Sequence, residues 1–217
     1  MTNYSVVKCD VRKCLDKLSK QNLITSRAPL YADNITYIIL GKSDLYDYEQ
    51  DYASFYNKLT NGEKPVTMLN DGGVIFTQFY FNKGQLVKGS HSYYPNPGLP
   101  LAEEFSTQQA YQPKPEHNPT IRIDFDRASY RELVHPKIHT HLGQFCGRIL
   151  NSSFPLFSEF VNFVLFLTNE EYWIKFNNKG RMIDCSTYKT RRIANKSPFA
   201  ETLTGAERTL FSLKISE

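Results

Sequence analysis

The stretch VIFTQFYF at residues 74–81, with NKG at 82–84 and LVKGSHSY at 86–93, decides the fold. Its two flanking segments are rich in aromatic and β-branched residues, which favour strands. The Asn82-Lys83-Gly84 sequence between them is typical of the short turns that join antiparallel strands. The sequence therefore predicts a β-hairpin over residues 74–93.

Further elements are predicted on both sides of this hairpin. Apolar residues at helical spacing predict four helices, at about residues 9–23, from Ser43 or Asp44 to 61, from Ser153 to 167, and at 170–176. Segments rich in strand-forming residues predict strands at residues 35–40, 120–126, 137–143 and 210–215. The third helix is apolar nearly all round, so we expect it to be the central buried helix.

The order of these elements predicts a single α+β domain with a largely antiparallel sheet and helices packed on one face. The chain has 217 residues, of which 41% are hydrophobic, enough for a packed core. We expect a helical part at about 1–62, a sheet and motif core at about 63–176, and a basic segment with a closing strand at 177–217. Residues 101–118 are predicted to form a loop.

Composition excludes several classes of protein. The net charge of +4 permits nucleic acid as a partner without arguing for it, and the basic run at 189–196 is interpreted as a solvated loop. The four cysteines lack the spacing of a zinc site, which favours free thiols in a reducing compartment. No signal peptide and no apolar run of membrane-spanning length occurs. The expected location is cytoplasmic, away from the membrane.

Two neighbouring motifs carry the chemistry. The first is RIDFD at residues 122–126, and the second is HPKIHTHLG at 135–143. Because side chains alternate along a strand, Arg122, Asp124 and Asp126 share one face of the first strand. By the same rule His139 and His141 share one face of the second strand, with apolar residues on the opposite faces.

This arrangement predicts a metal site. Two histidines at i and i+2 have Cα atoms roughly 6.5 to 7 Å apart and can meet at one ion. Asp124 or Asp126 can complete a two-histidine, one-carboxylate set suited to Zn, Mn or Fe, and Asp124 is preferred. His135 is a candidate further ligand or general base, and Asp126 a candidate base. Arg122 and Arg148 are candidates for binding a phosphate.

Other interpretations of these residues stay open. The cluster can be a structural network in which the aspartates pair with arginines and the histidines bind the carboxylates. His91, with Gln78 and Tyr93, either approaches the same site or has no role. Cys146 lies near the histidines in the sequence and is a remote candidate nucleophile.

The two motifs, together with Arg148 and the PLFSEFVNFVL helix at 155–165, resemble the uncharacterised bacterial domain-of-unknown-function family 2290. In that family an R-I-D-Y-D strand precedes an H-P-x-x-H-x-H-x-G strand, an Arg and a P-x-x-F-x-x-F-I-L helix. Here Phe125 stands where the family usually has Tyr, and Leu150 departs from its R-I-P sequence. The resemblance implies a bacterial cytoplasmic protein and, by analogy only, a place in phage defence.

Three functions follow as hypotheses. The first is a metal-assisted phosphodiesterase or nuclease that uses the residues named above and takes nucleic acid or another phosphate-bearing substrate. The second is a non-catalytic binding or assembly subunit that works with a partner protein, with a docking surface around Tyr93, Tyr94 and residues 95–100. The third is a metal-independent RNase-type toxin in which His135 or His141 is the general acid-base.

Overall fold

The computed structural model describes residues 3–33, 35–41, 51–62, 65–98, 120–132, 134–143, 148–177 and 204. Within them, the helices are α1 (Asn3–Lys20), α2 (Tyr52–Thr60), α3 (Phe157–Thr168) and α4 (Glu170–Asn177). The strands are β1 (Ile24–Ser26), β2 (Leu30–Ala32), β3 (Tyr37–Leu40), β4 (Thr67–Leu69), β5 (Val74–Asn82), β6 (Gln85–Tyr94), β7 (Ile121–Asp126), β8 (Ile138–Leu142) and β9 (Ile149–Leu150).

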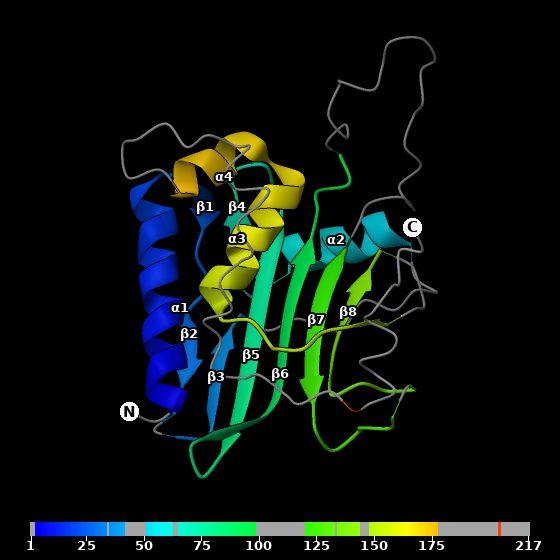
Figure 1. Cartoon of the computed structure of the whole chain (residues 1–217). Coiled ribbons are helices and arrows are strands. Elements are labelled where there is room, and N and C mark those ends of the chain that lie inside the picture. The colour runs from blue at the N-terminus through cyan, green and yellow to red at the C-terminus, as the bar shows by residue number, and fades with distance from the viewer. Residues whose placement is uncertain are drawn as a thin grey trace, which may run out of the picture.

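All nine strands form one antiparallel sheet around the predicted hairpin (Figure 1). Its main order is β1-β4-β5-β6-β7-β8-β9, and β3 pairs with β5 and with β2. The hairpin turns through Lys83 and Gly84, whose φ angles are 49° and 77°. Positive φ at both turn residues matches the twist of the two strands, which is why a glycine is placed there.

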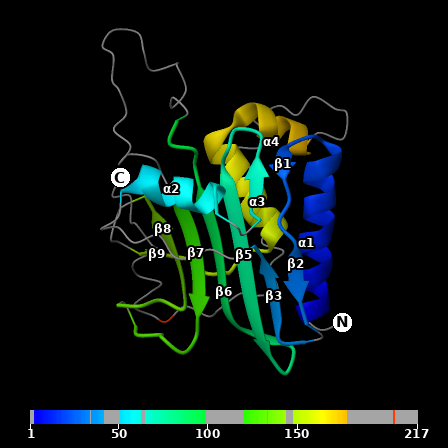
Figure 2. The ribbon, with the colours of Figure 1, turned by 180° about the vertical axis from the view of Figure 1, so that it is seen from behind.

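Helices cover the two faces of the sheet unequally. On β5, Ile75 and Phe79 point to the main core with α1, α3 and α4, whereas Val74 and Phe76 pack in a second cluster with α2. Figures 1 and 2 show α1, α3 and α4 on one side of the sheet and α2 on the other. The α+β class and the largely antiparallel sheet are confirmed, and α2 is the helix that departs from one-face packing.

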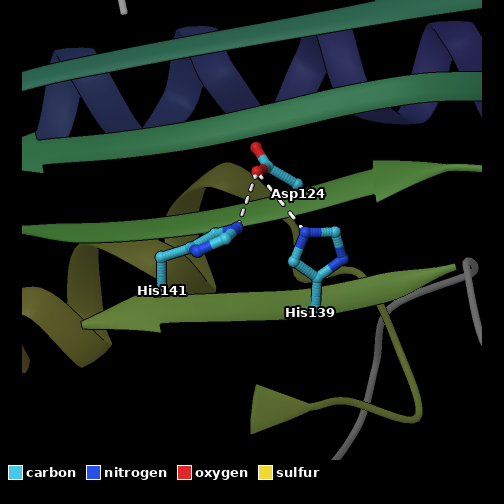
Figure 3. A group of neighbouring side chains, drawn as sticks. All are labelled: Asp124, His139 and His141. Carbon is cyan, nitrogen blue, oxygen red and sulfur yellow. Dashed lines mark ion pairs between the residues drawn. The ribbon is translucent and has the colours of Figure 1, made fainter. Parts of the chain in front are cut away.

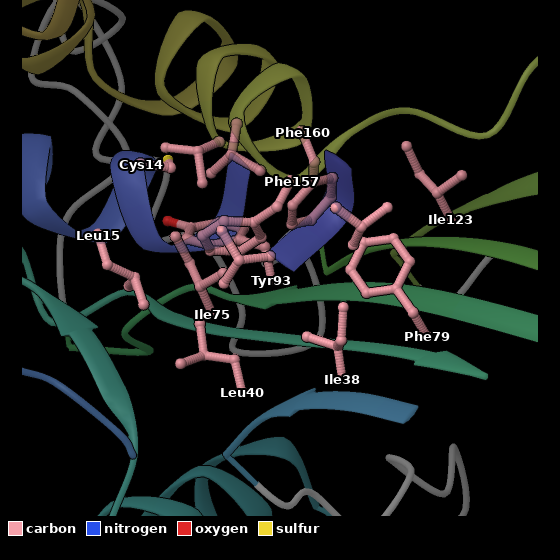
Figure 4. Packing of buried hydrophobic residues seen from close by; sticks show 14 of the residues in the cluster. Cys14, Leu15, Ile38, Leu40, Ile75, Phe79, Tyr93, Ile123, Phe157 and Phe160 are labelled. Atoms are coloured by element: carbon pink, nitrogen blue, oxygen red, sulfur yellow. The ribbon is translucent and has the colours of Figure 1, made fainter. Parts of the chain in front are cut away.

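The main core is built from alternate residues of the strands and one face of α1, α3 and α4 (Figure 4). Leu15, Ile38, Phe79 and Phe157 are each fully shielded from solvent. Burying a side chain of this size contributes about 1.5–3 kcal/mol to folding. The core lies on the side of β7 that carries Ile121, Ile123 and Phe125, so the opposite side of β7 is left for polar residues.

The expectation that the third helix is buried on all sides is wrong. In α3, Phe166 and Leu167 are 44% and 51% exposed, because the helix lies against the sheet and α1 and leaves its outer side to solvent. The helix begins at Phe157, four residues after Ser153. Asp10 of α1 fixes this start by accepting hydrogen bonds from the backbone N–H and the hydroxyl of Ser158, at 3.0 and 2.6 Å.

Other boundaries shift by a few residues. Helix α1 runs from Asn3 to Lys20 rather than over 9–23. Helix α2 is capped by Asp51, whose carboxylate accepts from the Ser54 N–H. The predicted start at Ser43 or Asp44, the 101–118 loop, Cys146 and the 210–215 strand lie outside the described residues. Among the helices described, none is long and apolar enough to cross a membrane.

Position 89 of β6 requires a glycine because the Phe154 ring lies close to it. A Cβ at this position would lie 2.7 Å from Phe154 Cε1 and 2.9 Å from Cζ. We expect Gly89→Ala to lower the free energy of unfolding by about 1–3 kcal/mol, because the ring must shift within a packed core. Urea denaturation measures this. Gly98→Ala is the control, since its nearest neighbour atom, Asn96 Oδ1, is 3.4 Å away; equal losses for both variants would contradict the explanation.

Candidate metal centre

Strands β7 and β8 bring the two sequence motifs side by side. Their antiparallel register pairs Arg122 with His141 and Asp124 with His139. Asp124, His139 and His141 point towards one another on the face of the sheet away from α1 and α3 (Figure 3). The prediction that these side chains share one polar face therefore holds for all three.

The distances within this group suit a shared ion. Asp124 Oδ2 lies 3.8 Å from His139 Nε2 and 3.5 Å from His141 Nε2. All three ligand atoms lie within 4.8 Å of one another. Ligand atoms about 2.0–2.2 Å from a tetrahedral metal are roughly 3.3–3.5 Å apart, so the two Asp–His distances already suit a shared ion, whereas the widest separation in the group, up to 4.8 Å, would have to shorten. At 3.8 and 3.5 Å the two Asp–His distances are longer than a good direct hydrogen bond, whereas Arg122 pairs with Asp124 as the structural-network interpretation predicts.

His139 is held in the form that a metal requires. Its Nδ1 lies 3.0 Å from the Pro136 carbonyl oxygen, which only accepts, so Nδ1 carries the proton and Nε2 carries the lone pair. Burial lowers the pKa of His139 to about 4, against the opposing effects of that hydrogen bond and of Asp124. The ring is therefore neutral near pH 7, with its lone pair directed towards a carboxylate. A carbonyl that orients a histidine in this way is common behind metal ligands.

Asp124 is ionised in this environment. Burial alone would raise its pKa, but contacts with His141, Arg122 and Ser90 outweigh burial and lower the pKa below its usual value. Arg122 Nε donates to Oδ2 and Ser90 Oγ donates to Oδ1, each at 2.8 Å. The carboxylate is thus fixed in orientation by two donors while Oδ2 faces both histidines.

Two buried imidazole nitrogens in the described part of the chain have no hydrogen-bond partner. They are Nε2 of His141 and Nδ1 of His135. The His135 ring stands edge-on to His139, with centroids 4.8 Å apart, and His139 stands likewise to His141 at 4.8 Å. His135 lies beside the three-residue group rather than in it. Leaving a buried polar atom unpaired costs free energy, so each such atom calls for a ligand or a functional reason.

The remaining predicted residues lie at the edges of the group. Asp126 accepts hydrogen bonds from the Ala128 and Ser129 backbone N–H groups and from the Ser129 hydroxyl, so its carboxylate holds the turn after β7. Arg148 is exposed just before β9. If the pairing of β8 with β9 is extended by one residue, Arg148 falls opposite His141.

The suggestion that His91 approaches this site is wrong. His91 pairs with Ile123 of β7 and therefore points into the main core. Its ring is fully buried and stacks between Phe154 and Phe160, with centroids 4.6 and 4.9 Å away. Thr77 Oγ1 lies 2.7 Å from Nδ1, and the Pro155 carbonyl oxygen lies 2.9 Å from Nε2. His91 is a structural histidine.

Sequence reasoning missed two residues that prepare the site. Ser90 holds Asp124 from β6, and Pro136 supplies the carbonyl that sets the His139 tautomer. Once the pairing of β6 with β7 is known, alternation identifies Ser90, because it lies directly opposite Asp124. A backbone carbonyl carries no side-chain signal, so Pro136 could not be found from residue types.

Comparison with known proteins places the chain in a family. Residues 18–215 match the family described as Uncharacterized conserved protein (DUF2290), and the chain belongs to it. No curated protein and no solved structure matches the chain. The match covers every strand and both motifs.

Proposed function

We propose that this protein is a metal-assisted phosphodiesterase or nuclease whose metal ligands are Asp124, His139 and His141. The observation that carries the proposal is the orientation of His139: a neutral imidazole directs its Nε2 lone pair at an ionised carboxylate 3.8 Å away. Two electron-rich groups facing each other repel, unless a cation lies between them. The second histidine adds a further ring nitrogen without a hydrogen-bond partner among the described residues.

The donor set fits a divalent transition metal. One carboxylate and two imidazoles leave further coordination positions for water and substrate, as in catalytic zinc, manganese or iron sites. Held by Asp124, His139 and His141, such a metal would supply Lewis-acid chemistry, polarising a phosphoryl oxygen and making a coordinated water more acidic.

The residues around the ligands supply the other roles. His135 stands next to His139 with an unpartnered buried Nδ1, which suits it to take or give a proton. The Arg122 guanidinium holds Asp124 through Nε, and its planar fork suits a phosphate oxygen. Arg148, exposed near the end of β8, is the second candidate phosphate ligand. Asp126 is the alternative base, in competition with the turn that it holds.

One argument for the alternative function, a non-catalytic binding subunit, was a docking surface around Tyr93 and Tyr94. Tyr93 and Tyr94 are each only 3% exposed, because they pack into the cores on opposite faces of the sheet. They therefore cannot form the expected docking surface. The metal-independent RNase alternative uses the same histidines and is separated from the proposal by its resistance to chelators.

The proposal is tested by metal analysis and cleavage assays on the purified chain. We expect the wild type to hold stoichiometric metal and to cleave RNA, DNA or an activated phosphodiester, and to lose cleavage in EDTA. Adding Zn, Mn or Fe should restore it. His139→Ala with His141→Ala should remove metal and reduce cleavage by at least about 100-fold, as expected when metal activation of water is lost.

The outcome can also go against the proposal. Cleavage that persists in EDTA and requires His135 would select the RNase-type alternative. Absence of metal, with no change in any activity when both histidines are replaced, would leave the cluster as a structural network.

A further inference from the structure

Aromatic side chains lie on the same face of the sheet as the candidate metal centre. Strand pairing sets Tyr37 of β3 opposite Tyr80 of β5, which is opposite Lys88 of β6 and then Asp126 of β7. A parallel row runs from Tyr31 at the β2 edge through Ile39, Gln78 and Ser90 to Asp124 and His139. We call Tyr31, Tyr37, Tyr80 and Lys88 the tyrosine face.

This face is accessible. Tyr31 and Tyr37 are 52% and 36% exposed, the Lys88 side chain is 59% exposed, and Tyr80 is half-buried. Helix α2 lies on the same side of the sheet, but it packs on Val74, Phe76 and Tyr94 at the other end of β5 (Figure 2). Tyr37 and Tyr80 are directly opposite each other on neighbouring strands, so their rings form a contiguous aromatic surface.

We infer that the tyrosine face binds single-stranded nucleic acid and leads it to the metal centre. The rings offer flat surfaces on which unpaired bases can stack, and stacking is tolerant of sequence because every base has a π face. A duplex hides its base faces, so the same rings would gain little from it. Lys88 lies between Tyr80 and β7; its ammonium is 3.7 Å from Asp126 and its side chain is 59% exposed, so it can also contact the negative backbone of such a ligand.

The spacing is consistent with one continuous ligand. Neighbouring strands lie about 4.8 Å apart, so Tyr80 is roughly 10 Å and Tyr37 roughly 14 Å from the β7 strand that carries Asp124. A short oligonucleotide covers this length. The part of the inference that leads the ligand to the metal centre rests on the proposed function. Binding by the tyrosine face itself can be measured without cleavage.

Binding is tested with the full chain in EDTA, by fluorescence anisotropy of labelled single-stranded RNA and DNA of mixed sequence. We expect Tyr37→Ala and Tyr80→Ala each to weaken binding about tenfold, and the double variant to weaken it further. Tyr37→Phe with Tyr80→Phe should bind within about twofold of wild type, because stacking is kept. Phe166→Ala removes an aromatic residue of similar exposure on α3, on the other side of the sheet, and should have no effect. Thermal melts verify that each variant is folded.

The possible outcomes of these experiments distinguish a failure of this inference from a failure of the proposed function. Binding of RNA alone, DNA alone or both supports it and identifies the ligand. It is overturned if neither single strand binds, if a duplex of the same sequence competes equally, or if the folded alanine variants bind as wild type. If the metal-loaded wild type binds single strands but cleaves none of them, the result would count against the proposed function alone. Cleavage that holds while the tyrosine variants bind normally would count against the tyrosine face alone.

Discussion

An Asp124→Asn variant is expected to lose metal affinity by at least about 100-fold while remaining folded. Asp124 is the one carboxylate in the ligand group, and its Oδ2 faces both histidines. Asparagine keeps the shape of the side chain and can still accept a hydrogen bond from Ser90, but it lacks the negative charge that attracts a divalent cation. Loss of a carboxylate that ligates the metal should exceed the 10–100-fold typical of residues that only support ligands. Competition with a coloured chelator measures the affinity.

Asp126→Asn is the matched control for this variant. It lies two residues along the same strand, on the same face, and makes the same change of charge. Because its carboxylate holds the 127–129 turn, we expect a loss of at most about 1 kcal/mol in stability and an unchanged metal affinity. Equal loss of metal in both variants would mean that the general negative charge of the face, rather than Asp124, attracts the ion.

Replacing His91 is expected to cause a large loss of stability. His91→Ala should lower the free energy of unfolding by about 3–5 kcal/mol, because it empties a fully buried space between two phenylalanine rings. It also leaves the Thr77 hydroxyl and the Pro155 carbonyl without their partner. His91→Phe should cost less, about 1–3 kcal/mol, since it fills the space and loses only the hydrogen bonds. Losses of similar size in the two variants would show that packing contributes little here.

The pH dependence of stability provides a separate test of His91. Burial lowers its pKa to about 4 in the folded protein, from about 6.5 when unfolded. Below pH 6.5 the unfolded chain therefore binds protons more readily, so stability falls as the pH drops from about 6.5 towards 4. His91 alone accounts for up to about 3 kcal/mol of this loss. Urea denaturation at several pH values should show a shallower decline for His91→Phe than for wild type; parallel curves would contradict the assignment.

The local sequence pattern was sufficient to predict the structure where residue type and spacing alone decide it. The 74–93 hairpin, the strands at 121–126 and 138–142 and the short helix α4 match the predicted segments closely. Alternation also placed Asp124 and Asp126 on one face of their strand and His139 and His141 on one face of theirs. The register of β7 with β8, which pairs Asp124 with His139, then brought Asp124 to the histidines. Boundaries were less accurate at α3, which begins at Phe157. There Glu159 accepts from the Leu156 N–H, and Asp10, 148 residues before Ser158, accepts from the Ser158 N–H and hydroxyl.

The sequence by itself determined the antiparallel sheet, the polar face of β7 and β8, and the short set of aspartates and histidines from which the ligand candidates come. These depend on backbone periodicity and on the contrast between polar and apolar residues, which are local. Only the tertiary structure decided that His91 belongs to the core and Ser90 to the site, since the register between β6 and β7 sends neighbouring residues to opposite faces. It alone also placed the Pro136 carbonyl behind His139 and the tyrosines on the same face of the sheet as Asp124. These relations depend on which strands become neighbours, and that is settled by packing across the whole sheet rather than by any one segment.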